Sequence, residues 1–285
     1  MSKIQQYLHK VDTVQQSTPF VSFIVAVVKR YGDDEVGHKA ALLTYYAFLS
    51  LFPLLILFIT LTNILVTANP GLEAQITKHI FQFFPSLGGE IKQNVSSLHS
   101  TGLALLLQIA VILYGARGFA SILQETFNDV WHVAKDDRPG ALGNQLRSVS
   151  MMLAVGFGII IGTAVSYVLG NIIDLGFIGT VLLTLVNVAI ASGLFLTVFR
   201  LGTSDRISLK RLLLGSVIAA TGTIIIQRLG GFIMTHQLSR LEGAYGSFAF
   251  ALAVIFWIYL QAQVILYALV VTVVRTEHDW PKKLF

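Results

Sequence analysis

Four stretches of this chain run for 25 residues or more without a charged side chain. On insertion scales, Asp, Lys or Arg at a helix centre costs ~2.5 to 3.5 kcal/mol, and one membrane span needs ~20 apolar residues. Two further apolar runs carry one charge each, at Arg117 and Arg228. The sequence therefore predicts an all-α integral membrane protein whose six transmembrane helices cover about residues 42–66, 102–123, 149–171, 178–199, 212–233 and 247–273.

The composition argues against a large water-soluble domain. Of the 285 residues, 54% are hydrophobic and 12% are charged, whereas a soluble globular domain carries about 25% charged residues. The chain has no Cys, so it offers no disulfide, no thiolate metal site and no Cys nucleophile. The net charge of +5 reflects the side of the membrane that the loops face. Neither a nucleic-acid partner nor a cofactor is predicted.

The distribution of Lys and Arg predicts the orientation. With the N-terminus inside, 15 of the 20 Lys and Arg residues fall in inner segments and three in outer ones. Such an asymmetry places both the N-terminus and the C-terminus in the cytoplasm. We expect residues 1–40 to form a cytoplasmic or interfacial segment, residues 41–275 the six-helix membrane domain, and residues 276–285 a cytoplasmic tail.

Two segments outside the predicted spans have amphipathic patterns. Residues 20–28 are apolar and too short to cross the membrane, so we expect a helix on the inner surface with Lys29 and Arg30 at the lipid headgroups. The first outer loop, residues 67–101, predicts two amphipathic helices that rest on the outer face of the membrane or cover the bundle. Their apolar faces consist of Ile76, Ile80, Phe83 and Phe84 and of Ile91, Val95 and Leu98.

The predicted spans lack the side chains that membrane-embedded enzymes use. None of the seven His residues and no Asp or Glu falls inside a span, so a Ser–His pair, a zinc site or a set of acidic metal ligands is not expected there. The adjacent Asp136 and Asp137 are interpreted as a solvated turn. The sequence therefore predicts a protein that is not an enzyme.

Polar side chains in the first span share one face. Tyr46, Ser50 and Pro53 are spaced at i, i+4 and i+7. Proline at this depth frees the carbonyl of Leu49, which needs another partner in lipid. A kink satisfied by a neighbouring helix and an opening that lines a polar path both account for this pattern.

The last span has a similar polar face. Tyr259, Gln263 and Tyr267 follow at i, i+4 and i+8, with Trp257 and Gln261 beside them. Such side chains face other helices rather than lipid. They are candidates for a substrate surface, and contacts between helices account for them nearly as well.

The two arginines inside predicted spans are the sharpest candidates. An ionisable residue at this depth indicates a functional site, although Arg near a helix end can also extend to the headgroups. Arg117 lies near the inner end of its span and Arg228 near the outer end of its own, so the two belong to opposite leaflets. Gly115 and Gly118, beside Arg117, predict close approach of another helix.

At these residues the chain resembles a known family. Residues 41–53, with the sequence ALLTYYAFLSLFP, resemble the signature AAxxxYYxxxSLxP of the YihY/BrkB membrane proteins, once misnamed ribonuclease BN. Asn128 and Trp131 match an N-x-x-W segment of that family. Tyr245-Gly246, followed by Trp257-Ile258-Tyr259, matches another. Where the family has a Gly-Ala-Glu step in the last helix, this chain has Tyr267-Ala268-Leu269, which argues against a mechanism that relies on that carboxylate.

The resemblance implies a multi-pass protein of the bacterial inner (plasma) membrane with a role in the cell envelope. Together with the arginines, it favours a transporter, most simply a flippase or exporter of an anionic lipid or lipid-linked envelope precursor. The alternative is a scaffold for envelope assembly that transports nothing. The expected partner is thus a membrane lipid or lipid-linked substrate, and the sequence leaves the oligomeric state open.

Overall fold

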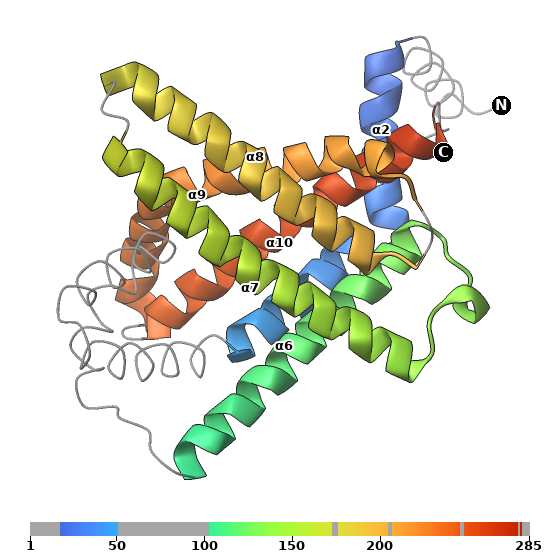
Figure 1. Cartoon of the computed structure of the whole chain (residues 1–285). Helices are drawn as coiled ribbons and strands as arrows, with labels where there is room; N and C mark the ends of the chain where they lie inside the picture. Colours follow the sequence, from blue (N-terminus) through green and yellow to red (C-terminus); the bar gives the residue numbers. More distant parts are fainter. Residues whose placement is uncertain are drawn as a thin grey trace.

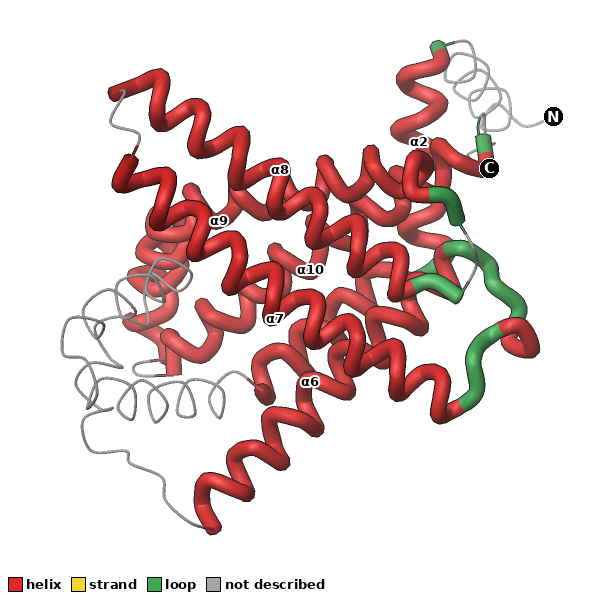
Figure 2. The backbone as a smooth tube through the Cα atoms, in the orientation of Figure 1, coloured by secondary structure: helices red, strands yellow, loops and turns green. Residues whose placement is uncertain are grey.

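The computed structural model describes residues 18–50, 103–172, 176–204, 207–245, 248–278 and 280. Within these residues all regular structure is helical and no strand is present (Figures 1 and 2). This confirms the prediction of an all-α protein. Besides a helix over residues 36–50, the elements are α2 (Pro19–Asp33), α6 (Leu103–Val130), the 3-10 turn η1 (Lys135–Asp137), α7 (Ala141–Ile172), α8 (Gly176–Gly202), α9 (Leu209–Tyr245) and α10 (Phe248–Glu277).

Three of the described helices are long and apolar enough to cross a membrane. These candidate spans are Ile178–Gly202 in α8, Leu209–Gly230 in α9 and Ala251–Glu277 in α10. They fall on three of the six stretches predicted from the charge gaps. The second part of the first predicted span, and the two predicted amphipathic helices of residues 67–101, lie outside the described residues.

The helices extend beyond the predicted spans at several ends. Helix α6 continues to Val130 and α9 to Tyr245, past the predicted ends at residues 123 and 233. Charge gaps mark the part of a helix that tolerates lipid, whereas backbone hydrogen bonds continue into polar sequence as long as no Pro or Gly signal stops them.

Small residues let neighbouring helices approach closely. Helices α9 and α10 follow each other in the chain and pack along much of their length. A Cβ added at Gly222 of α9 would lie 2.6 Å from Cγ1 of Val264 in α10, and one at Gly230 would lie 2.5 Å from the ring of Trp257. Between α7 and α8, a Cβ at Gly158 would lie 2.6 Å from Leu194. Contacts of this kind supply the packing that holds helices together in lipid.

The buried core lies where α6, α8, α9 and α10 meet. The ring of Phe127 in α6 packs edge-on against that of Phe199 in α8, with centroids 5.3 Å apart. Around them lie fully buried aliphatic side chains, among them Leu212 of α9 and Leu266 and Leu269 of α10. The core is therefore built from the ends of these helices that are nearest to residues 131–140.

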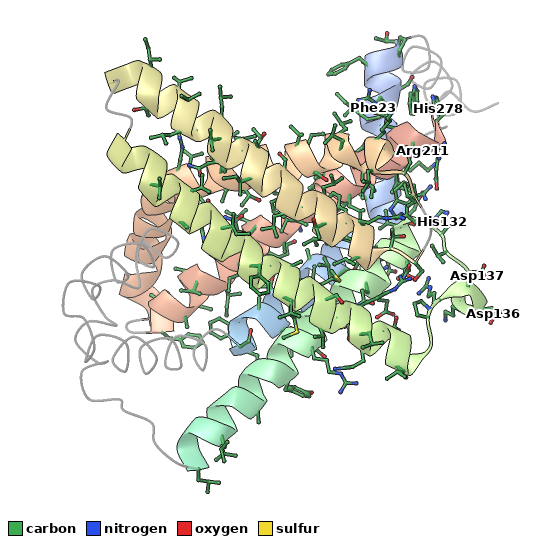
Figure 3. All side chains as sticks on the ribbon, viewed as in Figure 1. Phe23, His132, Asp136, Asp137, Arg211 and His278 are labelled. Carbon is green, nitrogen blue, oxygen red and sulfur yellow. The ribbon has the colours of Figure 1, made fainter. Side chains whose placement is uncertain are left out.

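The connections at that end of the molecule gather together. We call it the polar end and define it by residues 131–140, Thr203 and Ser204. Figure 3 shows His132, Asp136, Asp137, Arg211 and His278 toward this end. Asp136 and Asp137 are exposed in η1, as the interpretation of a solvated turn requires.

Candidate functional site

Arg228 lies on the exposed surface between α8 and α9. Its Nη2 donates a hydrogen bond to Thr184 Oγ1 of α8, and the Thr184 hydroxyl donates to the Thr180 carbonyl at 2.8 Å. The guanidinium is therefore held against α8 and keeps further donors for an outside ligand.

Arg117 also lies on an exposed surface, in the middle of α6. Gly115 and Gly118 turn toward the helix of residues 36–50, and Arg117 points elsewhere. Among the described residues, Arg117 has no ion-pair partner, and Glu125 on the same helix is likewise exposed. Within the described structure, the guanidinium of Arg117 therefore lies on the exposed surface of α6.

Tyr46 and Ser50 lie in the contact between the helix of residues 36–50 and α6. The Tyr46 ring covers Gly118, and a Cβ added at Gly115 would lie 2.7 Å from Ser50 Cβ. The Ser50 hydroxyl is within 3.0 Å of both the Tyr46 and the Ala47 carbonyl oxygens. The close packing expected at the two glycines is confirmed. Pro53, the third member of the predicted face, lies outside the described residues.

The polar face of α10 forms a cluster with α2. The Gln263 amide donates to the Tyr259 hydroxyl, and Gln263 Oε1 accepts from the hydroxyl of Tyr31 in α2. The Tyr31 ring stacks on Tyr267, with centroids 4.1 Å apart and planes 8° from parallel. Burial raises the pKa of the Tyr31 hydroxyl to about 12, so this hydroxyl remains a donor at neutral pH. The spacing of the α10 residues predicts their shared face, but nothing in the sequence pattern points to Tyr31.

Trp257 and Gln261 have different surroundings from this cluster. Trp257 is 4% exposed and its ring lies against Gly230 of α9. Gln261 Oε1 is buried and has no hydrogen-bond partner among the described residues. Both side chains belong to the contact surfaces of α10. The candidate residues that the structure describes therefore do not form one cluster.

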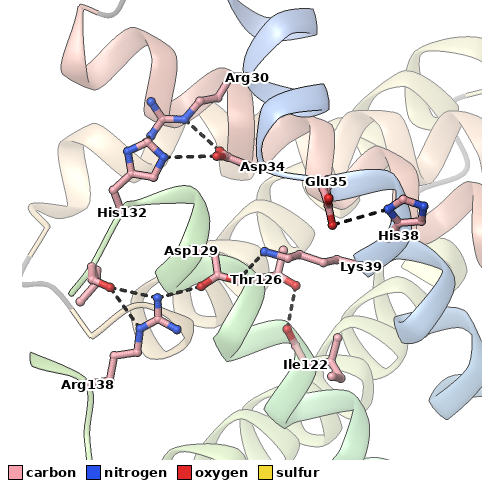
Figure 4. A network of polar contacts seen from close by, with 11 residues as sticks. Arg30, Asp34, Glu35, His38, Lys39, Ile122, Thr126, Asp129, His132 and Arg138 are labelled. Atoms are coloured by element: carbon pink, nitrogen blue, oxygen red, sulfur yellow. Dashed lines mark hydrogen bonds and ion pairs between the residues drawn. The ribbon is translucent and has the colours of Figure 1, made fainter. Parts of the chain in front are cut away.

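Arg30 is the centre of an ionic network at the polar end (Figure 4). Its Nε donates to Asp34 Oδ2 at 2.9 Å, and its Nη2 donates to the Val130 carbonyl at 2.7 Å and lies 3.3 Å from Glu277 Oε2. His132 Nδ1 is 3.3 Å from the same Nη2. Arg30 is only 3% exposed, so the prediction that it lies at lipid headgroups is wrong. The carboxylates and the carbonyl offset the cost of its burial.

A second ionic cluster joins the start of the 36–50 helix to the end of α6 (Figure 4). The Lys39 ammonium pairs with Asp129 Oδ2, and Arg138 Nη2 donates to Asp129 Oδ1 at 2.7 Å. Burial alone would raise the pKa of the Asp129 carboxyl, but the hydrogen bonds from Lys39 and Arg138 outweigh it and lower this pKa. Asp129 is therefore ionised at neutral pH and holds two cations. Sequence reasoning missed this cluster because it searched for charges only inside spans.

Further polar contacts close the polar end between α6, α7 and α8. Asn128 Oδ1 accepts from the Ser204 amide at 2.8 Å, which gives this motif residue a structural role. Arg147 of α7 donates to the Thr203 carbonyl at 2.9 Å, and the Gln124 amide donates to Ser148 Oγ at 2.8 Å. Within the described part of the chain no three His, Asp or Glu residues group as a metal site would need. The chemistry that these side chains offer is cationic and hydrogen-bonding, which suits anion binding.

The chain is similar to several known membrane proteins. A family model described as virulence factor BrkB matches residues 27–283. A UPF0761 membrane protein of Psychrobacter sp. (strain PRwf-1) is 24% identical over 282 residues, which covers 92% of this chain and 50% of that protein. The inner membrane protein YhjD of Escherichia coli (strain K12) is 23% identical over 180 residues, which covers 60% of this chain and 53% of that protein.

A third relative matches over nearly its whole length. The ribonuclease-like protein YfkH of Bacillus subtilis (strain 168) is 25% identical over 257 residues, which covers 86% of this chain and 92% of that protein. In contrast, the chain spans about half the length of the Psychrobacter and Escherichia coli relatives. No solved structure matches the chain significantly.

Proposed function

Because the chain belongs to the virulence factor BrkB family of membrane proteins, we propose that it is a transporter that moves an anionic lipid, or a lipid-linked envelope precursor, between the leaflets of the bacterial inner membrane. The Escherichia coli relative carries the name of an inner membrane protein. The proposal includes six membrane spans, and both termini lie in the cytoplasm. Three of the six spans coincide with candidate spans of the structure. It assigns the chain no catalytic chemistry.

The exposure of Arg117 and Arg228 is the observation that carries this proposal. Both side chains lie on helix surfaces that lipid can reach, and Arg228 is held at its place by Thr184. A guanidinium binds a phosphate with two parallel hydrogen bonds and keeps its charge at any physiological pH. Because the two arginines belong to opposite predicted leaflets, each would receive an anionic headgroup on its own side.

Reconstitution in liposomes tests the proposal. Movement of a fluorescent phosphatidylglycerol is compared with that of a phosphatidylcholine carrying the same label. We expect Arg117→Gln and Arg228→Gln each to slow the anionic lipid at least about tenfold, equivalent to ~1.4 kcal/mol on the barrier, and to spare the zwitterionic lipid. Lys at either position should rescue in part, because a point charge replaces a planar fork.

Two controls make the assay decisive. Lys210→Gln removes one positive charge from an exposed position at the start of α9 and should leave the transport rate unchanged. Circular dichroism and gel filtration establish that each variant is folded. Parent-like rates in both folded Arg→Gln variants would show that the arginines only anchor their helices.

A second candidate function, a scaffold for envelope assembly without transport, also has an observation in its favour. Tyr46 and Ser50 are occupied by contacts with α6, and Gln263 joins Tyr259 to Tyr31 of α2. Polar groups used in this way hold helices together and need no path. Liposomes in which the purified protein accelerates neither lipid would favour the scaffold.

A further inference from the structure

The cluster of Lys39, Asp129 and Arg138 has an unbalanced charge. Two cations share one carboxylate, so the cluster carries a net charge of +1 while Asp129 is ionised. The network around Arg30 differs, because there Asp34 and Glu277 supply two carboxylates for one guanidinium. One additional negative charge would neutralise the Lys39 cluster, whereas the Arg30 network needs none.

The cluster also has donors to spare. Lys39 presents three ammonium protons, of which Asp129 takes one within the described structure. Arg138 uses Nε and Nη2 on the Val133 carbonyl, at 3.1 and 2.9 Å, and Nη2 also on Asp129. No described residue accepts a hydrogen bond from Arg138 Nη1. A phosphate oxygen is the kind of acceptor that such donors bind.

Arg138 is held in place before any ligand arrives. The Val133 carbonyl accepts from both of its nitrogens, and the Val133 amide donates to the Asn128 carbonyl at 2.8 Å. Asp129 stands in the last turn of α6, where the helix dipole also favours cations. Little ordering entropy would remain to be lost when an anion binds.

The cluster is reachable from the membrane surface. The side chains of Lys39 and Arg138 are each 19% exposed and that of Asp129 is 31% exposed. Figure 4 shows them together at the junction of the 36–50 helix and α6. In the proposed topology this junction faces the cytoplasmic leaflet, whose anionic lipids attract basic side chains near helix ends.

We propose that Lys39 and Arg138 bind the phosphate of an anionic lipid headgroup at the cytoplasmic leaflet, where the phosphate neutralises the positive charge that the shared carboxylate of Asp129 leaves uncompensated. The site is distinct from Arg117 and Arg228. It requires the proposed membrane orientation but not transport, so a scaffold would possess it as well.

Equilibrium binding measures the site without any transport. The protein in dodecyl maltoside micelles is titrated with dansyl-labelled phosphatidylglycerol, and energy transfer from tryptophan reports the bound lipid. A phosphatidylcholine with the same label measures binding that does not depend on charge. We expect Lys39→Gln and Arg138→Gln each to weaken phosphatidylglycerol binding about fivefold, the usual effect of one basic residue near a membrane surface.

Asp129→Asn separates binding from a purely structural role. Each glutamine variant removes one ion pair and Asp129→Asn removes both, so all three variants should lower the melting temperature. Unlike the glutamine variants, Asp129→Asn leaves both cations without their shared carboxylate, so phosphatidylglycerol affinity should rise. Lys39→Arg and Arg138→Lys keep the charge and should retain binding within about twofold, because the attraction to an anionic lipid depends mainly on charge.

Lys210→Gln is the matched control, since it removes an exposed positive charge at the start of α9, outside the cluster. An equal loss of binding in Lys210→Gln would show that the lipid responds to general surface charge and not to this site, and it would overturn the proposal. A loss in Asp129→Asn would also overturn it, because the cluster would then act only as a brace. Glycerol 3-phosphate at millimolar concentration should compete poorly, and effective competition would assign the site to a soluble phosphate instead of a lipid. The liposome assay can fail or succeed independently of each result.

Discussion

The contact between Gly115 and Ser50 gives the most direct test of the helix packing. A Cβ added at position 115 would lie 2.7 Å from Ser50 Cβ and 3.3 Å from both the Ser50 nitrogen and Cα. These atoms belong to the backbone or are fixed directly to it, so no side-chain rotation removes the clash. Carbon atoms pack at ~3.5 to 4.0 Å, so the 36–50 helix and α6 must separate by about 1 Å in Gly115→Ala.

The expected energy follows from two opposing effects. Overpacking a tight contact costs ~1 to 3 kcal/mol, and replacing Gly by Ala within a helix returns ~1 kcal/mol. We therefore expect Gly115→Ala to lose about 1 kcal/mol of unfolding free energy. Gly156→Ala in α7 is the matched control, because no described atom lies within 4 Å of its added Cβ. That variant should gain up to about 1 kcal/mol.

Thermal unfolding in detergent, followed by tryptophan fluorescence, measures the difference between the two variants. At about 2 to 4 °C per kcal/mol for domains of this size, their midpoints should differ by roughly 4 to 8 °C. Adding Ser50→Gly to Gly115→Ala should recover part of the loss, because it deletes the nearest clashing carbon. Equal shifts of the same sign in Gly115→Ala and Gly156→Ala would refute the close contact.

Three further predictions concern orientation, pH and the first span. Because the chain has no Cys, a single Cys can be introduced at Gln93 or at Lys135 and labelled in whole cells with an impermeant maleimide. We expect labelling at position 93 and none at position 135. Labelling at position 135 alone would show that the topology is reversed. The pKa of the Asp129 carboxyl is lower in the folded protein than in the unfolded chain, where it is ~3.9. The ion pairs of Asp129 therefore stabilise the fold fully at a pH above the unfolded pKa. This stabilisation is lost as the pH falls through the pKa of the folded state. The melting temperature of the parent should thus drop more steeply below about pH 4 than that of Asp129→Asn, and parallel curves would contradict the pairing. If Pro53 opens a path for lipid, Pro53→Ala should preserve or raise the melting temperature and lower the rate of lipid movement in liposomes. An unchanged rate would show that the proline only kinks the helix.

The predictions from the sequence succeeded where one local pattern decides the structure. Charge-free stretches locate α8 and α10 because the cost of a charge in lipid is large compared with other helix preferences. The i, i+4, i+8 spacing places Tyr259, Gln263 and Tyr267 on one face of α10. Gly115 and Gly118 indicate that another helix packs closely on α6.

Contacts between distant segments could not be predicted in this way. Tyr31 meets Gln263 across 232 positions, and no periodicity links α2 to α10. Arg30 follows an apolar run, a pattern typical of a headgroup anchor, yet its burial depends on Val130 and Glu277. Asn128 and Asp129 lie beyond the charge gaps, and although Asn128 belongs to the family motif, no pattern in the sequence shows that these two residues join α6 to its surroundings.

The docking of α2 on α10 has a consequence for the synthesis of this protein. Among the described helices α2 is synthesised first, but Tyr31 needs Gln263 and Tyr267, and Arg30 needs Glu277. Through most of translation α2 therefore lacks its partners, and its apolar residues Phe20 and Ile24, which stay exposed even in the finished fold, can hold it against the bilayer. Among the described helices, the one that is synthesised first therefore finds its packing partners in α10 only after most of the chain has been made.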